Sequence, residues 1–289
     1  MSQIDQFESV FKAAAKPVFE VASVSVRTLL VVTDLDSRSA QAFAERLRSF
    51  LRVLEAGDDV AAAVDWQVID GSQFGSVGDL LALVEQHAPD LICTYRNLHS
   101  NAWQWPYTLG DHLEVLTQTV AVPVLVVPRP DADGFQRATE GTGRVMAITD
   151  HLAGEQRLVN WAIRFTAPQG CLYLTHVEDH RAFDRYIDVI SKLPGIDTDM
   201  ARAAISKRLL KEPRDYIRST REALQHRGST MRVEEIVTLG RHLEQYRHLV
   251  SHHAIDLLVF STKDQDQLAM HGLAYPLAVE LRGTALLML

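Results

Sequence analysis

Short apolar runs alternate with amphipathic stretches along most of the chain. Residues 28–34 and 144–150 are rich in Val, Leu, Ile and Thr, and each run ends in an aspartate. The stretch that follows, residues 39–54 or 154–165, repeats apolar residues at the three- and four-residue spacing of a helix. Near-continuous apolar strands that alternate with helices are typical of a parallel sheet covered on both faces. The pattern therefore predicts an α/β protein built on open, mostly parallel sheets.

The same order of elements occurs twice. Each half later contains a strand, a glycine, a helix and a second strand, and it closes with a helix and an apolar run at residues 122–127 or 285–289. Between the halves, residues 128–144 are rich in Pro, Gly, Asp and Thr, which is typical of a linker. A repeat of this length indicates a duplicated domain rather than a solenoid. The predicted division is a first domain at 1–128, a linker at 129–143 and a second domain at 144–289.

The two halves differ in length. The second contains an extra strand at residues 171–179 and a long helical stretch after it, so the first lacks one strand–helix unit. The apolar run at residues 17–26 is predicted to supply a substitute strand, which would give each half five strands. The preceding helix, predicted at residues 3–16, would pack on the sheet.

The composition of the chain excludes some classes of partner and compartment. Apolar residues make up 47% of the chain, enough for two ordinary cores, and the net charge is −8. An acidic chain lacks the clustered positive charge of a broad nucleic-acid or anionic-membrane surface, so neither partner is expected. Cys93 and Cys171 lie in apolar runs and are predicted to be small buried residues in a reducing compartment. The sequence shows neither a signal peptide nor a membrane-spanning run, and we expect a cytoplasmic protein.

Several segments resemble the universal stress protein family. Residues 174–179 resemble its second strand with a His-Val pair, and residues 236–260 resemble its third strand, glycine turn, helix and fourth strand. Residues 110–127 and 272–289 both match its closing block of glycine, helix and strand. The resemblance implies two flavodoxin-like (adenine nucleotide alpha hydrolase-like) domains in tandem, related by a pseudo-two-fold axis. It also implies a binding or signalling module of the stress response rather than an enzyme.

Nucleotide-binding members of this family carry a G-x2-G-x9-G-[ST] loop, in which glycines let backbone N–H groups approach the phosphates. The first half keeps Gly110, but Asn97 and Ser100 replace the two earlier glycines and Asp111 replaces the hydroxyl residue. The second half keeps Gly272, but the next residue is leucine, which donates no side-chain hydrogen bond. Both loops are degraded for phosphate binding. We therefore expect neither ATP nor another cofactor.

The remaining candidate site residues follow the predicted strands, where open α/β sheets place their ligands. Asp34 and Asp150 end the first strand of each half, although each could equally be a helix N-cap or a turn residue. Donors after the fourth strands could bind a small polar or anionic ligand or could be solvated loop residues. Trp103 and Trp105 lie where the glycine loop would be and could pack or stack on a ligand. The donors are Arg96, Asn97 and His99 in the first half and Ser261, Thr262 and Lys263 in the second.

Three other functions stay open. The run at residues 29–37 resembles the opening motif of haloacid-dehalogenase-type phosphatases, with Asp34 as nucleophile and Asp36 as general acid or base. However, no lysine lies between Lys16 and Lys192 to balance the charge of a phosphate. A nucleotide-binding stress protein and a purely structural protein-interaction module are the other two. His248 and His252 are one helical turn apart but lack a third ligand, so no metal site is predicted.

Both closing strands would leave an apolar edge of the sheet exposed, and such edges invite pairing. The economical solution is for the two edges to pair within one chain as an internal pseudo-dimer, which places Val124 and Leu286 at the seam. Further dimerisation of the whole chain and a protein partner stay open.

Overall fold

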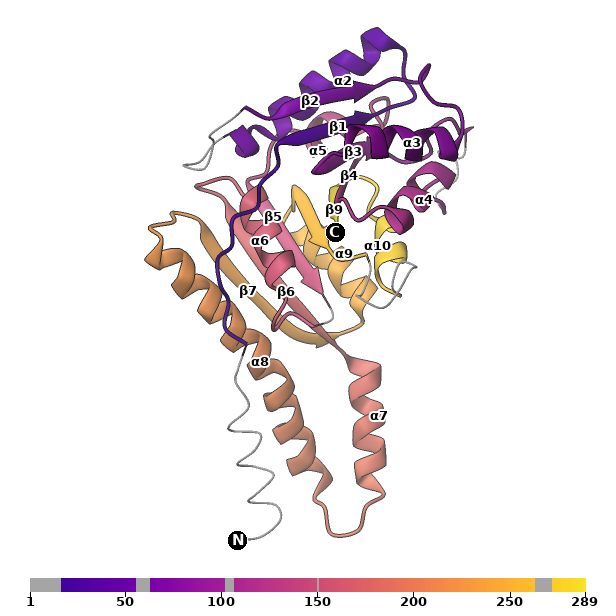
Figure 1. The fold of residues 1–289 in the computed structure, drawn as a ribbon. Helices are drawn as coiled ribbons and strands as arrows, with labels where there is room; N and C mark the ends of the chain where they lie inside the picture. Colours follow the sequence, from indigo (N-terminus) through magenta and orange to yellow (C-terminus); the bar gives the residue numbers. More distant parts are fainter. Residues whose placement is uncertain (1–16, 56–62, 102–106, 150, 263–271) are drawn as a thin grey trace.

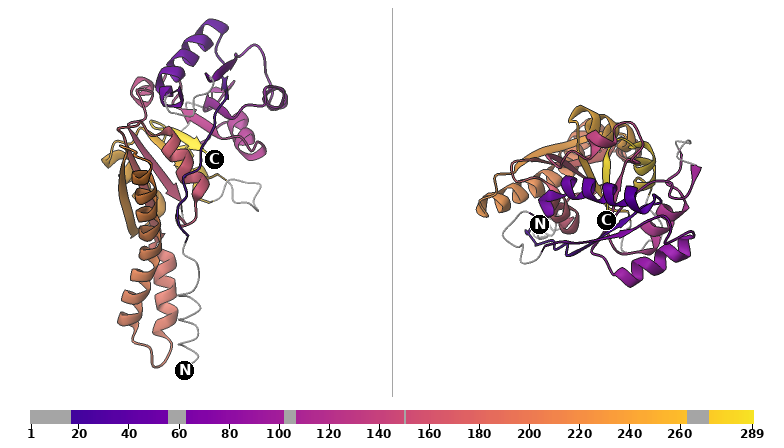
Figure 2. Two further views of the ribbon diagram at one scale, coloured as in Figure 1. Left: turned by 60° about the vertical axis from the view of Figure 1, so that its left-hand side comes forward. Right: turned by 90° about the horizontal axis from the view of Figure 1, so that it is seen from above.

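One mixed sheet runs through both halves of the chain (Figure 1). The structure, a computed structural model, describes residues 17–55, 63–101, 107–149, 151–262 and 272–289. Within these residues nine strands form a single sheet in the order β2-β1-β3-β4-β9-β8-β5-β6-β7. Neighbouring strands are parallel, except that β4 and β9 are antiparallel. Helices lie on both faces (Figures 1 and 2), so the predicted α/β fold is confirmed.

In the second half the five strands follow the flavodoxin-like order β7-β6-β5-β8-β9, and all of them are parallel. The elements are β5 (Arg144–Thr149), α6 (Gln156–Phe165), β6 (Cys171–Asp179), α7 (His180–Ser191), α8 (Thr198–His226), β7 (Arg232–Gly240), α9 (His242–His252), β8 (Leu257–Phe260), α10 (Ala274–Glu280) and β9 (Ala285–Met288). A short helix, α5 (Phe135–Ala138), lies in the predicted linker.

The first half has four strands among its described residues, in the order β2-β1-β3-β4. The prediction of five strands in this half is therefore wrong, because β2 pairs directly with β1 where the second half inserts an additional strand. The elements are β1 (Thr28–Val32), α2 (Ser37–Phe50), η1 (Arg52–Glu55), β2 (Asp65–Ile69), α3 (Val77–His87), β3 (Leu91–Tyr95), α4 (Asp111–Thr119) and β4 (Val124–Val127).

Residues 17–26 form an extended strap instead of the predicted substitute strand. The strap leaves β1 and crosses helices α6 and α8 of the second half (Figure 1). The Phe19 amide donates to Ser219 Oγ at 3.0 Å, and the Ala22 amide donates to Asn160 Oδ1 at 2.8 Å. Side chains of α6 and α8 thus accept hydrogen bonds from two amides of the strap. In a strand, these amides would bond to a neighbouring strand instead. The helix predicted at residues 3–16 lies outside the described residues.

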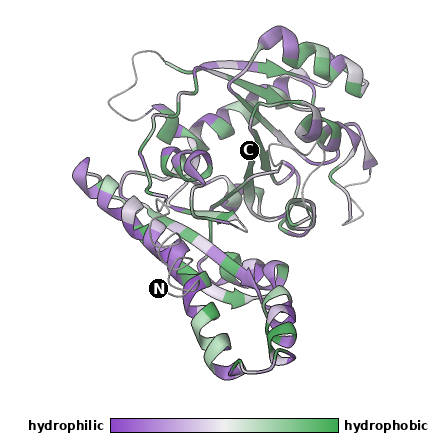
Figure 3. Ribbon diagram, turned by 60° about the horizontal axis from the view of Figure 1, so that its bottom comes forward, coloured by the Kyte–Doolittle hydropathy of each residue, from purple (hydrophilic) through white to green (hydrophobic). Residues whose placement is uncertain are grey.

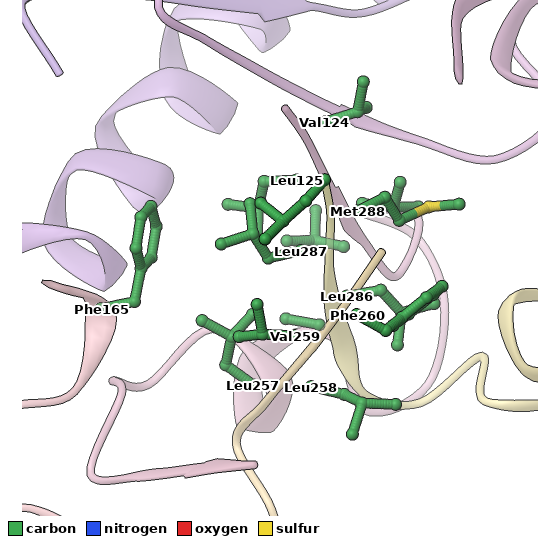
Figure 4. Close-up of a cluster of buried hydrophobic side chains, with 14 of the residues drawn as sticks. Val124, Leu125, Phe165, Leu257, Leu258, Val259, Phe260, Leu286, Leu287 and Met288 are labelled. Carbon is green, nitrogen blue, oxygen red and sulfur yellow. The ribbon is translucent and has the colours of Figure 1, made fainter. Parts of the chain in front are cut away.

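The closing strands of the two halves pair at the centre of the sheet. Leu125 lies opposite Leu287, and Val126 lies opposite Leu286, in an antiparallel ladder. Figure 4 shows Leu125, Leu286 and Leu287 packed with residues of β8 in one apolar cluster. These three side chains and Val126 are fully buried. This confirms the predicted pairing of closing strands and the placement of Leu286 at the seam. The core is therefore continuous from one half to the other.

Helices α7 and α8 form a hairpin that projects beyond the sheet (Figures 1 and 2). Phe183 and Ile187 are its buried contacts on α7, and an Asp197 N-cap begins α8. Hydrophobic and hydrophilic positions are mixed along both helices of the hairpin (Figure 3). Its exposed large apolar side chains are Tyr186, Val189, Leu193, Ile196 and Met200. Among the described residues no helix has the length and apolar character needed to cross a membrane.

Candidate ligand-binding crevices at the carboxyl ends of the strands

Asp34 lies just beyond β1 and joins three strand ends of the first half. Its Oδ1 accepts a hydrogen bond from the Tyr95 hydroxyl at the end of β3. Its Oδ2 accepts from the His99 amide at 2.9 Å and from Arg129 Nη1, just after β4, at 3.4 Å. The side chain is only 10% exposed. Both carboxylate oxygens therefore already have protein donors.

The surroundings of Asp34 hold it in the charged form. Burial by itself would raise the pKa of Asp34, but the Tyr95 hydroxyl, the His99 amide and the Arg129 guanidinium together hold it below its usual value. The pKa of Tyr95 is raised, by burial and then by the neighbouring carboxylate, so that the hydroxyl stays a donor. Asp34 is therefore a buried, ionised aspartate that connects the carboxyl ends of three strands through its three hydrogen-bond donors.

The degraded loop of the first half folds back on itself at Gly110. The Asn97 amide donates to Leu109 O at 2.8 Å, and Gly110 has a φ of 87°. A Cβ added at Gly110 would lie 2.7 Å from the Asn97 Cα, closer than real Cβ contacts come. Only glycine fits this close approach without strain.

The N-terminus of α4 is occupied by the chain's own acidic residues. Asp111 is the first residue of the helix, where Gly110 provides no side-chain cap. Glu114 Oε1 accepts from Thr108 Oγ1 at 3.2 Å, from the Leu109 amide at 3.3 Å and from the Tyr275 hydroxyl at 2.9 Å. These carboxylates complement the positive end of the helix dipole, which in a phosphate loop would face the ligand.

Three rings lie together beside this loop. The ring centroids of Phe74 and His99 are 4.7 Å apart, those of Phe74 and His112 are 5.6 Å apart, and those of the two histidines are 5.7 Å apart. Burial, followed by the charge of His99, lowers the pKa of His112, and its Nε2 has no hydrogen-bond partner. His112 is therefore neutral near pH 7. The sequence analysis identified His99 but missed Phe74 and His112, which approach one another only in the folded chain.

Arg96 is placed beneath helix α10 of the other half. Its Nε and Nη2 donate to Ala278 O at 3.1 and 2.7 Å, and Nη2 also donates to Leu281 O at 3.1 Å. Carbonyl groups at a helix C-terminus carry partial negative charge and bind cations well. Burial, followed by the charge of Arg282, lowers the pKa of Arg96 to about 10. Arg96 thus caps α10 and ties the two halves together.

The second-half candidates lie in a different setting. Thr262 is buried, and both its amide and its hydroxyl donate to Leu289 O at 2.9 Å, while Ser261 is only partly exposed. Gly272 has no atom within 4 Å of an added Cβ, so this glycine makes no close approach like that of Gly110. Asp150 and Lys263 lie outside the described residues, as do Trp103 and Trp105.

A small polar pocket opens where β5 and β6 end. It has a volume of about 70 Å³ and is lined by residues that include His151, His176, Glu178 and Arg208. His176 Nε2 lies 3.3 Å from Glu178 Oε2, and burial holds the pKa of this histidine below its usual value although Glu178 acts in the opposite direction. A pocket of this size holds roughly two water molecules, at about 30 Å³ each, and not a nucleotide.

The described residues contain no group of three or more His, Cys, Asp or Glu side chains suited to a metal ion. The rings of His248 and His252 stack on each other with centroids 5.6 Å apart. Cys93 and Cys171 are both buried and free, as the sequence predicts.

Solved structures share this fold, although no protein-family model and no curated protein sequence matches the chain. One is a protein of unknown function from Pseudomonas aeruginosa PAO1, with a TM-score of 0.52 and 13% identity over 91% of this chain and 92% of that one. Another is a universal stress protein from Archaeoglobus fulgidus DSM 4304, with a TM-score of 0.50 and 13% identity over 90% of this chain and 95% of that one. The likeness runs through both halves.

At this level of identity the likeness establishes the fold. The chain has the flavodoxin-like, adenine nucleotide alpha hydrolase-like fold of universal stress proteins. The fold that the order of segments in the sequence implies is therefore confirmed.

Proposed function

We propose that this chain is a tandem universal stress protein that serves the stress response as a binding or signalling module, without catalysis and without ordinary ATP binding. The fold and the order of sequence segments support the family placement. The observation that carries the loss of ATP binding is the state of the first-half loop. Asp34 already has three donors, and Asp111 and Glu114 occupy the N-terminal turn of α4.

Electrostatics supports this reading. A triphosphate seated on the loop would bring its oxygens close to Asp111 and Glu114. Two like charges about 4 Å apart repel by on the order of 4 kcal/mol at the effective dielectric of a protein surface. Backbone N–H groups at a helix N-terminus favour an anion, but here two carboxylates have taken that favourable position. The second-half loop offers Leu273 at the equivalent place, and it supplies no donor.

The geometry also disfavours the phosphatase alternative. Asp36 is the N-cap of α2, and its carboxylate accepts from the amides of Arg38 and Ser39. Hydrogen bonds from the Ser39 hydroxyl and amide hold the pKa of Asp36 below its usual value. A general acid that works near pH 7 needs a raised pKa instead. Asp34 is turned into its own network rather than toward an open site.

Isothermal titration calorimetry with Mg-ATP tests the proposal directly. We expect no saturable binding below millimolar concentration for the wild type. The matched variant Asp111→Ser restores the hydroxyl residue and removes one carboxylate, so it should bind ATP at least as well as the wild type. Micromolar affinity of the wild type would overturn the proposal. Hydrolysis of p-nitrophenyl phosphate that is lost in Asp34→Asn would establish the phosphatase alternative.

A further inference from the structure

A larger pocket lies at the seam between the two halves, beside the loop that runs from Asn97 to Gly110. It has a volume of about 280 Å³ and is formed by the loops after β3 and β4 and by the turn that precedes β9. Asn97 and Thr108 of that loop line it, whereas Asp34 and Gly110 do not. Its charged lining residues are Arg96, Arg129, Asp131, Asp133 and Arg282.

Two of the three arginines that line this pocket have no carboxylate partner among the described residues. Arg129 is paired with Asp34 and Asp131. Arg96 is 6% exposed, and its hydrogen bonds all go to backbone carbonyls, so no carboxylate among the described residues balances its charge. Among the described residues, neither the Arg96 Nη1 group nor the exposed Arg282 side chain has a hydrogen-bond or ion-pair partner.

These two guanidinium groups act on each other. The positive charge of Arg282 contributes to the lowered pKa of Arg96, so the pocket brings two like charges together. An anion between them would replace this repulsion with two attractions. Guanidinium groups bind phosphate through paired, charge-assisted hydrogen bonds that are stronger than neutral ones. A buried charge of this kind without a counter-charge is unusual in a protein interior.

The pocket also has room and acceptors for more than an inorganic ion. Its volume equals roughly nine water molecules at about 30 Å³ each. Asn97 lines it, is 3% exposed and leaves its Oδ1 without a hydrogen-bond partner. Asp133 also lines the pocket, is exposed and has no ion-pair partner among the described residues. Such oxygens accept hydrogen bonds from hydroxyl groups.

We propose that this seam pocket binds a small organic monophosphate, with the phosphate at Arg96 and Arg282 and the hydroxyl-bearing part at Asn97. Arg96 comes from the first half and Arg282 from the second, so the ligand bridges the halves. Binding would therefore stabilise the seam between β4 and β9.

Calorimetry with ribose 5-phosphate, and with inorganic phosphate for comparison, tests the proposal on the full chain. We expect saturable binding of ribose 5-phosphate that is tighter than that of inorganic phosphate and that weakens as ionic strength rises. Arg282→Ala should weaken it about tenfold, because a charge-assisted hydrogen bond is lost. Asp133→Ala should strengthen it a few-fold, because a negative charge leaves the rim. Both side chains are exposed, so both variants are expected to fold.

Arg241→Ala is the matched control, because it removes an exposed arginine at the start of α9 that does not line the pocket. Its affinity for ribose 5-phosphate should equal that of the wild type. The proposal is overturned if neither probe binds at millimolar concentration. It is also overturned if Arg241→Ala weakens binding as much as Arg282→Ala, or if Arg282→Ala and Asp133→Ala shift the affinity in the same direction.

Discussion

At the scale of single residues, equivalent positions in the two halves of the chain lie in different surroundings. Gly110 and Gly272 open the same closing block in sequence. Gly110 is held at a φ of 87° against the backbone of Asn97, whereas Gly272 stands in open space without that constraint. Arg96, a ligand-binding candidate from the sequence, caps a helix of the other half.

This contrast predicts different outcomes for the same substitution. Gly110→Ala should destabilise the protein by about 2 kcal/mol or more, because alanine is strained at a left-handed φ and its Cβ would clash with Asn97. Gly272→Ala is the matched control and should change the stability by less than about 1 kcal/mol. Urea unfolding followed by circular dichroism measures both. An equal decrease in the free energy of unfolding of the two variants would show that the close approach at Gly110 does not affect stability.

At the scale of elements, the N-terminal strap is the clearest departure from a simple duplication. Asn160 on α6 holds it twice, because its Oδ1 accepts from the Ala22 amide and its Nδ2 donates to Glu20 O at 3.1 Å. Phe19 packs edge-on against Tyr216 of α8 with ring centroids 6.0 Å apart. The strap thus fastens the start of the first half to two helices of the second half.

Asn160→Ala should loosen this strap. It leaves one amide and one carbonyl of the strap without partners, which costs about 1–3 kcal/mol for partly buried groups. Hydrogen exchange at residues 17–27 should become faster, and proteases should cleave there first. Arg157→Ala, on the exposed side of the same helix, should leave both unchanged. Unaltered exchange in Asn160→Ala would mean that the apolar contacts of Phe19 suffice to hold the strap.

The elements that the sequence predicted correctly are those set by local patterns. The strands ending near Asp34 and Asp150 carry continuous apolar runs, and burial on both faces of the sheet demands such runs. The strap was mistaken for a strand because residues 17–26 are equally apolar, and the polar groups that hold it lie more than 130 residues away in the sequence. The ring cluster and the Arg96 cap escaped prediction for the same reason.

At the scale of the whole molecule, the seam makes the two halves one folding unit. Leu125 and Val126 of β4 and Leu286 and Leu287 of β9 are all fully buried, and they form a ladder that neither half can complete alone. Separating the halves would expose these side chains at a cost of about 1.5–3 kcal/mol each. It would also leave an unpaired apolar edge on each fragment.

The fragments 1–135 and 140–289 should therefore aggregate or self-associate when each is expressed alone. Each should also lose cooperative unfolding, since the ladder and the Arg96 cap on α10 both cross the seam. Size-exclusion chromatography with light scattering, together with urea unfolding, measures this, and the full chain is the control. Expressing the two fragments together should recover soluble material, because the missing edges then meet. Two fragments that are each soluble, monomeric and cooperatively folded would contradict the shared-edge architecture, and the antiparallel pair at the centre of the sheet would then be a contact between independent domains.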